Sequence, residues 1–201
     1  HDVDCFDNKN VTVVAQADLG WPWNTLARFG MFSRIKDQLA NYDYLFFFNA
    51  NALFMKTVDE SILPSSDEGI VVVQHPGQYN RTSKDFTYDR NPDSSAYIPM
   101  GTGSYYVCGC VNGGRAAVYL QMVDELNEAV NKDREKAVMA RWHDESHINK
   151  YILSKPHKLL SPAYCYPEGW NLPFESIVCI RDKSKYGGHN FLRKISWYSF
   201  M

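Results

Sequence analysis

The feature that most constrains the fold is an unbroken apolar run at residues 44–48, Tyr-Leu-Phe-Phe-Phe. Such a run is too short for a typical helix and is typical of a buried central strand. It ends abruptly in Asn49-Ala50-Asn51. Ligands gather at the carboxyl ends of strands in open α/β sheets, so these polar residues mark a candidate binding edge.

Strand and helix signals alternate along the rest of the chain. Short apolar or β-branched runs predict further strands at residues 11–15, 70–73, 105–107 and 177–180. Apolar residues at helical spacing predict one helix from Asn24 or Thr25 to Leu39, a long one around 119–130 and another around 148–152. Residues 80–104 are polar, with scattered Pro and Gly, and read as loop. This alternation predicts an α/β domain.

Composition excludes several classes of protein. A length of 201 residues suits one domain, and a net charge of −2 offers no basic field for nucleic acid. No apolar run approaches the ~20 residues of a membrane span. The five cysteines are odd in number and form no CxxC pair, so we expect reduced thiols in a cytoplasmic protein rather than a disulfide framework or a zinc ribbon.

The segment from Trp142 to His147 concentrates reactive side chains. His143 and His147 are four residues apart and could bind zinc from one helix face, but Asp144 stands where the zincin pattern requires Glu. A second interpretation is a helix start capped by Asp144 or Ser146. A third is a site for an oxocarbenium-like centre, which would use an indole beside adjacent carboxylates. The residues alone do not decide between the last two.

Asn49 and Asn51 occupy a position where nucleotide-sugar enzymes commonly carry an Asp-x-Asp pair that holds a divalent cation. Asparagine is uncharged and a poor ligand for a hard cation by comparison. Side-chain cations would then have to balance the charge of a departing diphosphate. Candidates are Arg28, Lys183, Lys185 and Arg193, although a solvated basic tail is the simpler interpretation of the last three taken alone.

Taken together, these segments resemble glycosyltransferase family 6, which includes the blood-group A and B transferases and α-1,3-galactosyltransferase. The resemblance runs from about Trp21 to Arg193 and is strongest to the bacterial members. The stretches that carry it are residues 46–51, His75-Pro76, Phe86-Thr87-Tyr88, 96–99, 142–150, 164–170 and 187–189.

The resemblance implies a single GT-A type domain over residues 1–201, with a mixed, Rossmann-like central sheet. It also implies that the first strands of the family fold are missing ahead of His1, and that a flexible basic tail begins at about residue 182. Retention of anomeric configuration is expected, as is metal independence, because bacterial members with Asn-Ala-Asn do not use a metal.

The roles of individual residues follow from the same resemblance. Glu145 resembles the catalytic carboxylate of the family. Donor contacts are expected at Arg28, Asn49, Asn51, Cys108, Gly109, Cys110, Asp144 and Lys183. Acceptor contacts are expected at His75, Thr87, Trp142 and Glu168. The small Cys108 leaves room for an acetamido group on the donor, whereas Cys110 reduces that room.

The expected reaction moves N-acetylgalactosamine, or else galactose, from a UDP-sugar to a galactose-terminated oligosaccharide, with or without fucose. No cofactor and no metal are expected, and neither is a nucleic-acid partner. The rival interpretation is a non-catalytic carbohydrate-binding protein that keeps the aromatic groove. A metal-dependent hydrolase is a third possibility.

Overall fold

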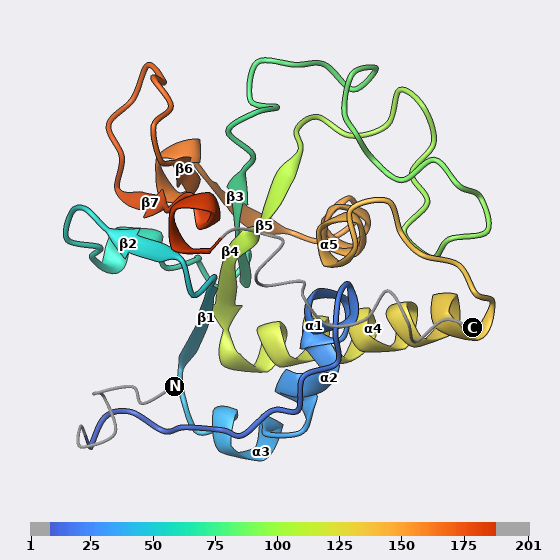
Figure 1. The fold of residues 1–201 in the computed structure, drawn as a ribbon, viewed down its shortest axis with the longest axis horizontal. Helices are drawn as coiled ribbons and strands as arrows, with labels where there is room; N and C mark the ends of the chain where they lie inside the picture. Colours follow the sequence, from blue (N-terminus) through green and yellow to red (C-terminus); the bar gives the residue numbers. More distant parts are fainter. Residues whose placement is uncertain (1–8, 188–201) are drawn as a thin grey trace.

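The fold was analysed in a computed structural model that describes residues 9–187 (Figure 1). It is a mixed α/β structure whose main sheet has the strand order β1-β4-β3-β5. The strands are β1 (Tyr44–Phe48), β4 (Val107–Arg115), β3 (Ile70–Gln74) and β5 (His157–Leu160). Strand β4 runs antiparallel to both of its neighbours, whereas β3 and β5 are parallel, so the sheet is mixed as predicted.

A smaller sheet lies beside the main one, with the order β2-β7-β6. It consists of β2 (Ala52–Phe54), β7 (Val178–Ile180) and β6 (Tyr166–Pro167). Three short 3-10 helices complete this half: η1 (Glu60–Ile62), η2 (Pro162–Cys165) and η3 (Lys183–Tyr186). The segment that follows the Asn49-Ala50-Asn51 turn is thereby joined to the C-terminal part of the chain.

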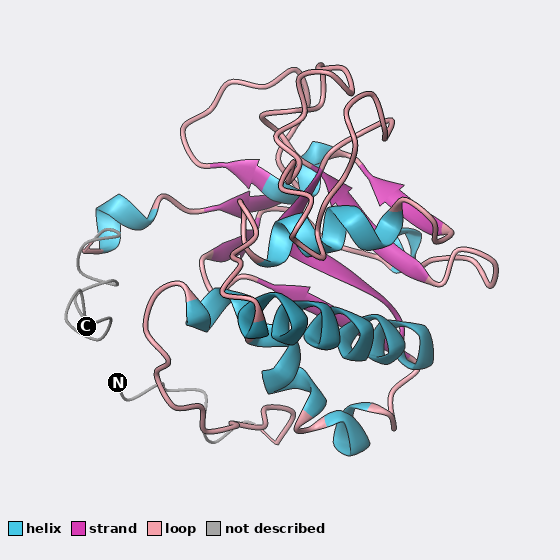
Figure 2. Ribbon diagram, turned by 90° about the vertical axis from the view of Figure 1, so that its right-hand side faces the viewer, coloured by secondary structure: helices cyan, strands magenta, loops and turns pink. Residues whose placement is uncertain are grey.

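Two longer helices correspond to the predicted ones, α4 (Ala116–Glu135) and α5 (Asp144–Ile152). The single helix predicted for residues 24–39 is instead three short ones: α1 (Trp23–Leu26), α2 (Arg28–Ser33) and α3 (Lys36–Leu39). The breaks fall at Ala27 and Ile35, whose ψ angles of 8° and 15° depart from helical values. In Figure 2 most of the helices lie below the strands, and long loops gather at the opposite end.

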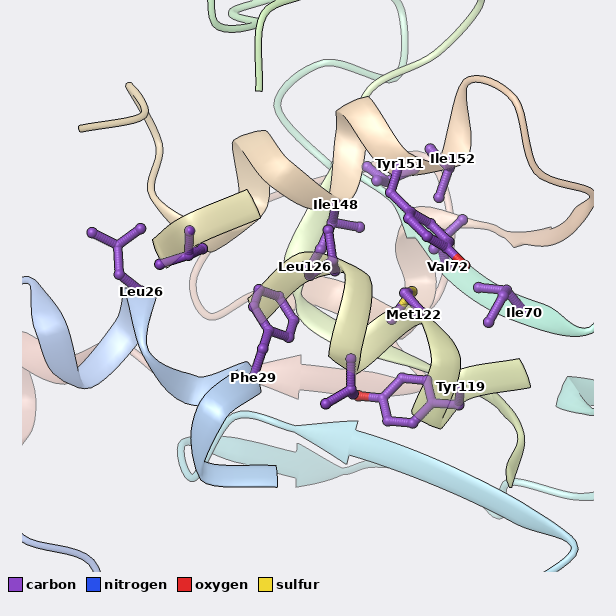
Figure 3. Packing of buried hydrophobic residues seen from close by; sticks show 13 residues of the cluster. Leu26, Phe29, Ile70, Val72, Tyr119, Met122, Leu126, Ile148, Tyr151 and Ile152 are labelled. Carbon is purple, nitrogen blue, oxygen red and sulfur yellow. The ribbon is translucent and has the colours of Figure 1, made fainter. Parts of the chain in front are cut away.

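The core is divided between the two faces of the main sheet. Strand β3 is buried on both faces, and its residues alternate between two clusters. Ile70 and Val72 pack in the larger cluster, where Figure 3 shows Phe29, Leu126 and Ile148 meeting from three different helices. The neighbouring residues of β3 point to the smaller cluster, which consists of Ile62, Val71, Val73, Cys108, Val111, Leu160 and Cys165.

Three predicted strands differ from the structure. Residues 11–15 form no strand, because this β-branched run lies exposed and pairs with no other segment that the structure describes. Strand β1 exists, but in the described part of the chain it is an edge strand with half-buried side chains, not a central buried one. The small-residue stretch 108–114, expected to follow a strand at 105–107, is itself the body of the central strand β4. A side chain at Gly113 would place its Cβ 2.5 Å from the carbonyl oxygen of Leu45 on β1, so close strand contact requires glycine there.

Candidate active site

A cleft of about 480 Å³ opens where the N-terminus of α5 faces strand β4 and helices α1 and α2. Its lining residues are Trp21, Asn24, Thr25, Arg28, Asn49, Gly109, Cys110, Trp142, His143, Asp144, Glu145 and Lys183. Most of the predicted donor-side residues therefore come together here, together with Trp142 from the predicted acceptor side.

Glu145 lies in the first turn of α5, and both of its carboxylate oxygens are held. Oε2 accepts a hydrogen bond from the backbone N–H of Gly109 at 2.8 Å. Oε1 accepts from the hydroxyl of Tyr106, which is fully buried, at 2.9 Å. The carboxylate thus has a fixed orientation at the cleft, which suits a group that must meet a reacting carbon in one geometry.

Asp144 forms an ion pair with Arg28 across the same cleft. The guanidinium of Arg28 lies 3.1 Å from Oδ2 of Asp144 and donates to the carbonyl oxygen of Gly109 at 3.1 Å. It also lies over the ring of Phe47, 4.4 Å from the centroid. Arg28 therefore ties helix α2 to β1, β4 and α5 at the point where the cleft opens.

Gly109 is the residue that lets α5 approach β4 so closely. A Cβ added there would lie 3.0 Å from Oδ2 of Asp144 and 3.2 Å from Cβ of Glu145. A side chain at this position would force Asp144 or Glu145 to shift by a few tenths of an ångström, so the close contact favours glycine.

The backbone at His143 sets where α5 begins. His143 is the N-cap residue with φ 53° and ψ −127°, an unfavourable conformation for a residue other than glycine. The alternative in which Asp144 or Ser146 caps the helix is not observed; the hydroxyl of Ser146 instead accepts from the N–H of Trp142 at 2.9 Å. The preceding N–H of Arg141 donates to buried Asp89, at 2.7 Å. Such strain at a site with two adjacent carboxylates is typical of functional positions.

The two histidines of this segment do not form a zinc pair. His147 is buried with Nε2 3.7 Å from Asp133, whereas the ring of His143 packs on Trp21 at the cleft. Within residues 9–187 the only cluster of three His, Cys or acidic side chains within reach of one ion is Cys108, Cys110 and Cys165, and the last two are joined to each other as a disulfide.

The environment of the cleft shifts the titration of both carboxyl groups toward neutral pH. Burial raises the pKa of Glu145 to about 7, while the hydrogen bonds from Gly109 and Tyr106 and the charge of Arg28 act in the opposite direction. Burial also raises the pKa of Asp144 to about 7; Arg28 lowers it, and the Glu145 charge raises it further. Paired acids with strongly shifted pKa values at a cleft are typical of active sites.

A second hollow of about 390 Å³ adjoins the cleft and shares Asn49 and Lys183 with it. It is lined by Asn49, Ala50, Asn51, Arg181, Lys183 and Tyr186. The Asn51 side-chain amide donates to the carbonyl oxygen of Arg181 at 2.7 Å, and the guanidinium of Arg181 stacks over the Tyr186 ring at 4.0 Å. Two neutral amides and two cationic residues therefore surround a space that could hold a diphosphate.

Of the other predicted cations, one is described by the structure and is paired. Lys185 forms an ion pair with Glu168 at 2.7 Å. Arg193 falls outside the described residues.

Two of the four predicted acceptor residues, His75 and Thr87, connect to the carboxylate through Tyr106. The His75 ring packs edge-on against the Tyr106 ring at 5.6 Å, and the Thr87 hydroxyl interacts with the Tyr106 hydroxyl. Trp142 is exposed in the cleft itself. Glu168, by contrast, is turned to the C-terminal segment, where it accepts from the N–H of Asp182 and pairs with Lys185.

The cysteines differ from the sequence-based expectation. Cys110 and Cys165 are joined as a disulfide, although they are 55 residues apart, because β4 and η2 meet in the smaller core cluster. Cys108 and Cys179 are free thiols. The prediction of reduced thiols is wrong for Cys110 and Cys165, and a cytoplasmic location loses that support. Cys108 is buried beneath the cleft and is not one of its lining residues.

Several residues of the site were not predicted from the sequence, among them Tyr106 and Arg181. Tyr106, which holds the carboxylate of Glu145, could have been found from the alternation of strand side chains, because it shares one face with Cys108 and Cys110. No sequence pattern of this kind marks Arg181 as a site residue. Its place beside Asn51 depends on the pairing of β2 with β7.

A mixed α/β fold with a fixed carboxylate at the edge of its main sheet, beside a cation-lined hollow, defines the class: the protein is a glycosyltransferase with a GT-A-like fold. The model of glycosyltransferase family 6 matches residues 11–194, and the chain belongs to this family. The resemblance inferred from the sequence motifs is thereby confirmed.

Three relatives illustrate the range of the family. The chain is 33% identical over 185 residues to the O-antigen biosynthesis glycosyltransferase WbnI of Escherichia coli, covering 92% of this chain and 78% of that protein. It is 34% identical over 168 residues to rat histo-blood group ABO system transferase 1, covering 81% and 47% respectively. It is 34% identical over 127 residues to globoside alpha-1,3-N-acetylgalactosaminyltransferase 1 of Gallus gallus, covering 63% and 36%. The chain thus spans less than half the length of these two vertebrate relatives.

Among the described residues, no helix has the length and apolar character needed to cross a membrane.

Proposed function

We propose that this protein transfers N-acetylgalactosamine, or else galactose, from a UDP-sugar to the 3-hydroxyl of a galactoside, with retention of configuration and without a metal ion. The observation that carries the proposal is the carboxylate of Glu145, held at the cleft by Tyr106 and Gly109. A fixed carboxylate beneath an anomeric carbon can form a covalent adduct with it or stabilise an oxocarbenium ion as the leaving group departs. By either route the acceptor hydroxyl forms its bond on the same face of the sugar from which UDP departs, so the anomeric configuration is retained.

The neighbouring hollow is proposed to take the diphosphate. Asn49 and Asn51 contribute no negative charge that would attract a divalent cation. Arg181 and Lys183 line the same space and would oppose the charge that builds on the departing UDP. In this proposal the two cationic side chains take the role that a metal has in enzymes with an Asp-x-Asp pair.

His75 is suited to contact the acceptor as a neutral donor. Its Nδ1 accepts from the N–H of Gly77 at 3.0 Å, which leaves the ring proton on Nε2. Burial and the charge of Arg81 lower the pKa of His75 to about 4, so the ring is uncharged at neutral pH. A neutral Nε2–H can donate to a sugar hydroxyl oxygen without placing a charge near the reacting centre.

The proposed donor sugar and linkage are based on the relatives of the chain and on the size of the cleft. A globoside alpha-1,3-N-acetylgalactosaminyltransferase is among the proteins that the chain resembles, which supports the α-1,3 linkage and N-acetylgalactosamine as donor sugar. Gly109 adds no side chain to the cleft, whereas Cys110, which is joined to Cys165, reduces the room there.

The test is UDP release by the full-length gene product, supplied with UDP-N-acetylgalactosamine and a β-galactosyl disaccharide. We expect UDP release that depends on the acceptor and a trisaccharide product whose new linkage is α-1,3. Binding of the disaccharide without UDP release from either donor would instead identify a non-catalytic carbohydrate-binding protein. An inverted, β-linked product would contradict the role given to Glu145.

A further inference from the structure

The side-chain amide of Gln78 begins a series of hydrogen bonds that ends on the carboxylate of Glu145. Gln78 lies in the loop between β3 and β4 and is buried, with 8% of its surface exposed. Its Nε2 donates to the hydroxyl oxygen of Thr87 at 3.1 Å. The Thr87 hydroxyl contacts that of Tyr106, and Tyr106 donates to Oε1 of Glu145 at 2.9 Å. These four side chains form what we call the Gln78 hydrogen-bond chain.

The two ends of the Gln78 hydrogen-bond chain fix its direction. An amide nitrogen can only donate, so the Thr87 oxygen accepts from Gln78. An ionised carboxylate can only accept, so the Tyr106 proton is directed at Glu145. The proton of the Thr87 hydroxyl joins the two halves by pointing at the Tyr106 oxygen. Every link therefore donates toward the carboxylate, and each donor polarises the next.

Tyr106 can transmit this polarisation because its ring is fixed. The ring is fully buried and stacks on Tyr88, with 5.3 Å between centroids and 26° between planes. On another side it packs edge-on against His75 at 5.6 Å. Only the hydroxyl proton is free to move. A donor that contacts the Tyr106 oxygen makes its O–H more polar, so the contact from Thr87 strengthens the hydrogen bond to Glu145.

The stability of the fold does not explain an amide at position 78. Oε1 of Gln78 is buried and has no hydrogen-bond partner among the described residues. Such an oxygen costs stability, a cost that an apolar side chain of similar size would avoid. The backbone is held without the side chain: the N–H of Gln78 donates to the His75 carbonyl oxygen, and the N–H of Arg81 donates to that of Gln78, each at 3.0 Å. What distinguishes glutamine from an apolar residue here is the donation from Nε2 to Thr87.

We propose that Gln78 is a positioning residue, which keeps the Thr87 proton aimed at Tyr106 and thereby strengthens the hydrogen bond from Tyr106 to the carboxylate of Glu145. Hydrogen bonds to a carboxylate favour its ionised form. Gln78 therefore helps Glu145 to carry a negative charge in a buried position that is unfavourable for charge. The inference rests on the proposed role of Glu145 and adds a residue that is not among those lining the cleft.

Other charged or titratable groups also face Glu145 and act on it independently of Gln78. They come from α2, from β4, from α5 and its N-cap, and from the C-terminal segment: Arg28, Tyr106, Cys108, His143, Asp144 and Lys183. Burial raises the pKa of Glu145 to about 7, while the hydrogen bond from Tyr106 acts in the opposite direction. A substitution at Gln78 changes none of these side chains, so its effect on the pKa of Glu145 would have to pass through Thr87 and Tyr106.

The experiment measures the pKa of Glu145 by NMR of the glutamate carboxyl carbons in the full-length protein, with the signal assigned as the one that is missing in Glu145→Gln. We expect Gln78→Leu to raise this pKa by about 0.3–0.5, Thr87→Val by more and Tyr106→Phe by about 1–2, because the bond to the charged group is the strongest and polarisation contributes a fraction of it. Thr87→Ser keeps the hydroxyl and should keep the wild-type pKa. The control Gln121→Leu, which removes an exposed amide on α4, should leave the pKa unchanged.

The pH dependence of transfer provides a second measurement. Below its pKa the ionised fraction of Glu145 decreases as that pKa rises, so Gln78→Leu should lower kcat/KM about two- to threefold at pH 6. At pH 9 Glu145 is ionised in both proteins, and kcat/KM should be the same. A loss of equal size at both pH values would indicate a purely structural role for Gln78 and would overturn the inference.

The NMR titration does not depend on transfer, which separates this inference from the proposed function. If the pKa of Glu145 rises in the stated order while the wild-type protein transfers no sugar, the Gln78 hydrogen-bond chain stands and the proposed function fails. Gln78→Met offers a second variant without the donor in case Gln78→Leu does not fold. An unchanged pKa of Glu145 in a folded variant that lacks the Gln78 amide, or in Thr87→Val, would show that the inference is wrong whatever the activity.

Discussion

Replacing Glu145 by glutamine removes the charge at the cleft while preserving the shape of the side chain. The amide oxygen can still accept from the N–H of Gly109, as the carboxylate does at 2.8 Å. The amide nitrogen can donate to Tyr106, because a hydroxyl can reverse from donor to acceptor. The substitution leaves neither hydrogen-bonding group at Glu145 without a partner, so the variant should fold. Any loss of activity would then be due to loss of the carboxylate charge.

The expected loss in kcat is roughly 10²- to 10³-fold, or about 3–4 kcal/mol, as for other groups that stabilise charge only in the transition state. KM for the donor should change little, because the carboxylate contributes mainly to the transition state. In the wild type kcat/KM should rise with pH through about 7, as the Asp144 and Glu145 pair ionises. In the variant the part of this rise that Glu145 contributes should be lost.

Stability should change in the opposite direction. The pKa of Glu145 is raised from 4.5 to about 7 by burial, so between these values the native protein holds a proton that the unfolded chain has lost. The free energy of unfolding therefore falls as pH rises through this window, by up to roughly 3 kcal/mol, and by less where water enters the cleft. Glutamine does not ionise, so at pH 8 Glu145→Gln should be at least as stable as the wild type, whereas at pH 4 the difference should vanish.

The assay combines UDP-release kinetics with thermal unfolding at pH 4 and pH 8, and uses Glu128→Gln on the exposed face of α4 as the matched control. The control should leave both kcat and Tm unchanged. Near-normal turnover in Glu145→Gln would refute the catalytic assignment. A large fall in Tm at pH 8 would show that the substitution destabilises the fold and does not simply remove the charge. It would also refute the reversal of the hydrogen bond at Tyr106.

Three further predictions concern the donor. Turnover should persist in excess EDTA and should not need manganese, because Asn49 and Asn51 offer no anionic cage for a cation; a collapse in EDTA that manganese reverses would refute this. Lys183→Ala should raise KM for the UDP-sugar about tenfold or more, since one cation lining the hollow is lost, and unchanged rates at sub-saturating donor would show that this lysine does not meet the diphosphate. In competition at equal concentration, UDP-N-acetylgalactosamine should be used in preference to UDP-galactose, by less than about 100-fold, because apolar pockets discriminate such changes by only about 1–3 kcal/mol; a preference for UDP-galactose would reverse the assignment.

Local sequence patterns determined the elements that can be read without knowing their partners. The β-branched run of β3 could only be a buried strand, and the apolar stripe of α4 specified a long helix packed on one side. Motifs in the correct order determined the family, and they are also the basis of the predicted roles of Glu145 and the asparagine pair. The strand β3 and the helix α4 could be predicted because each depends on residues that are a few positions apart in the chain.

Sequence patterns were a poor guide wherever a residue's environment came from another segment. Strand β1 has a central-strand pattern but lies at an edge among the described residues, because the composition of a strand does not specify its neighbours. The exposed run at 11–15 has high strand propensity but pairs with no strand among residues 9–187, so propensity alone produced a false prediction.

Only the tertiary structure decided how the site is held. Tyr106 meets Glu145 across 39 residues, Cys110 meets Cys165 across 55, and Asn51 meets Arg181 across 130. Each contact depends on the register of β4 or β7, or on the docking of α5, all of which are set by the burial of the whole core rather than by any local motif. The sequence thus determined which chemical groups the enzyme carries, whereas packing over long sequence separations determined which of them face each other and how strongly their pKa values shift.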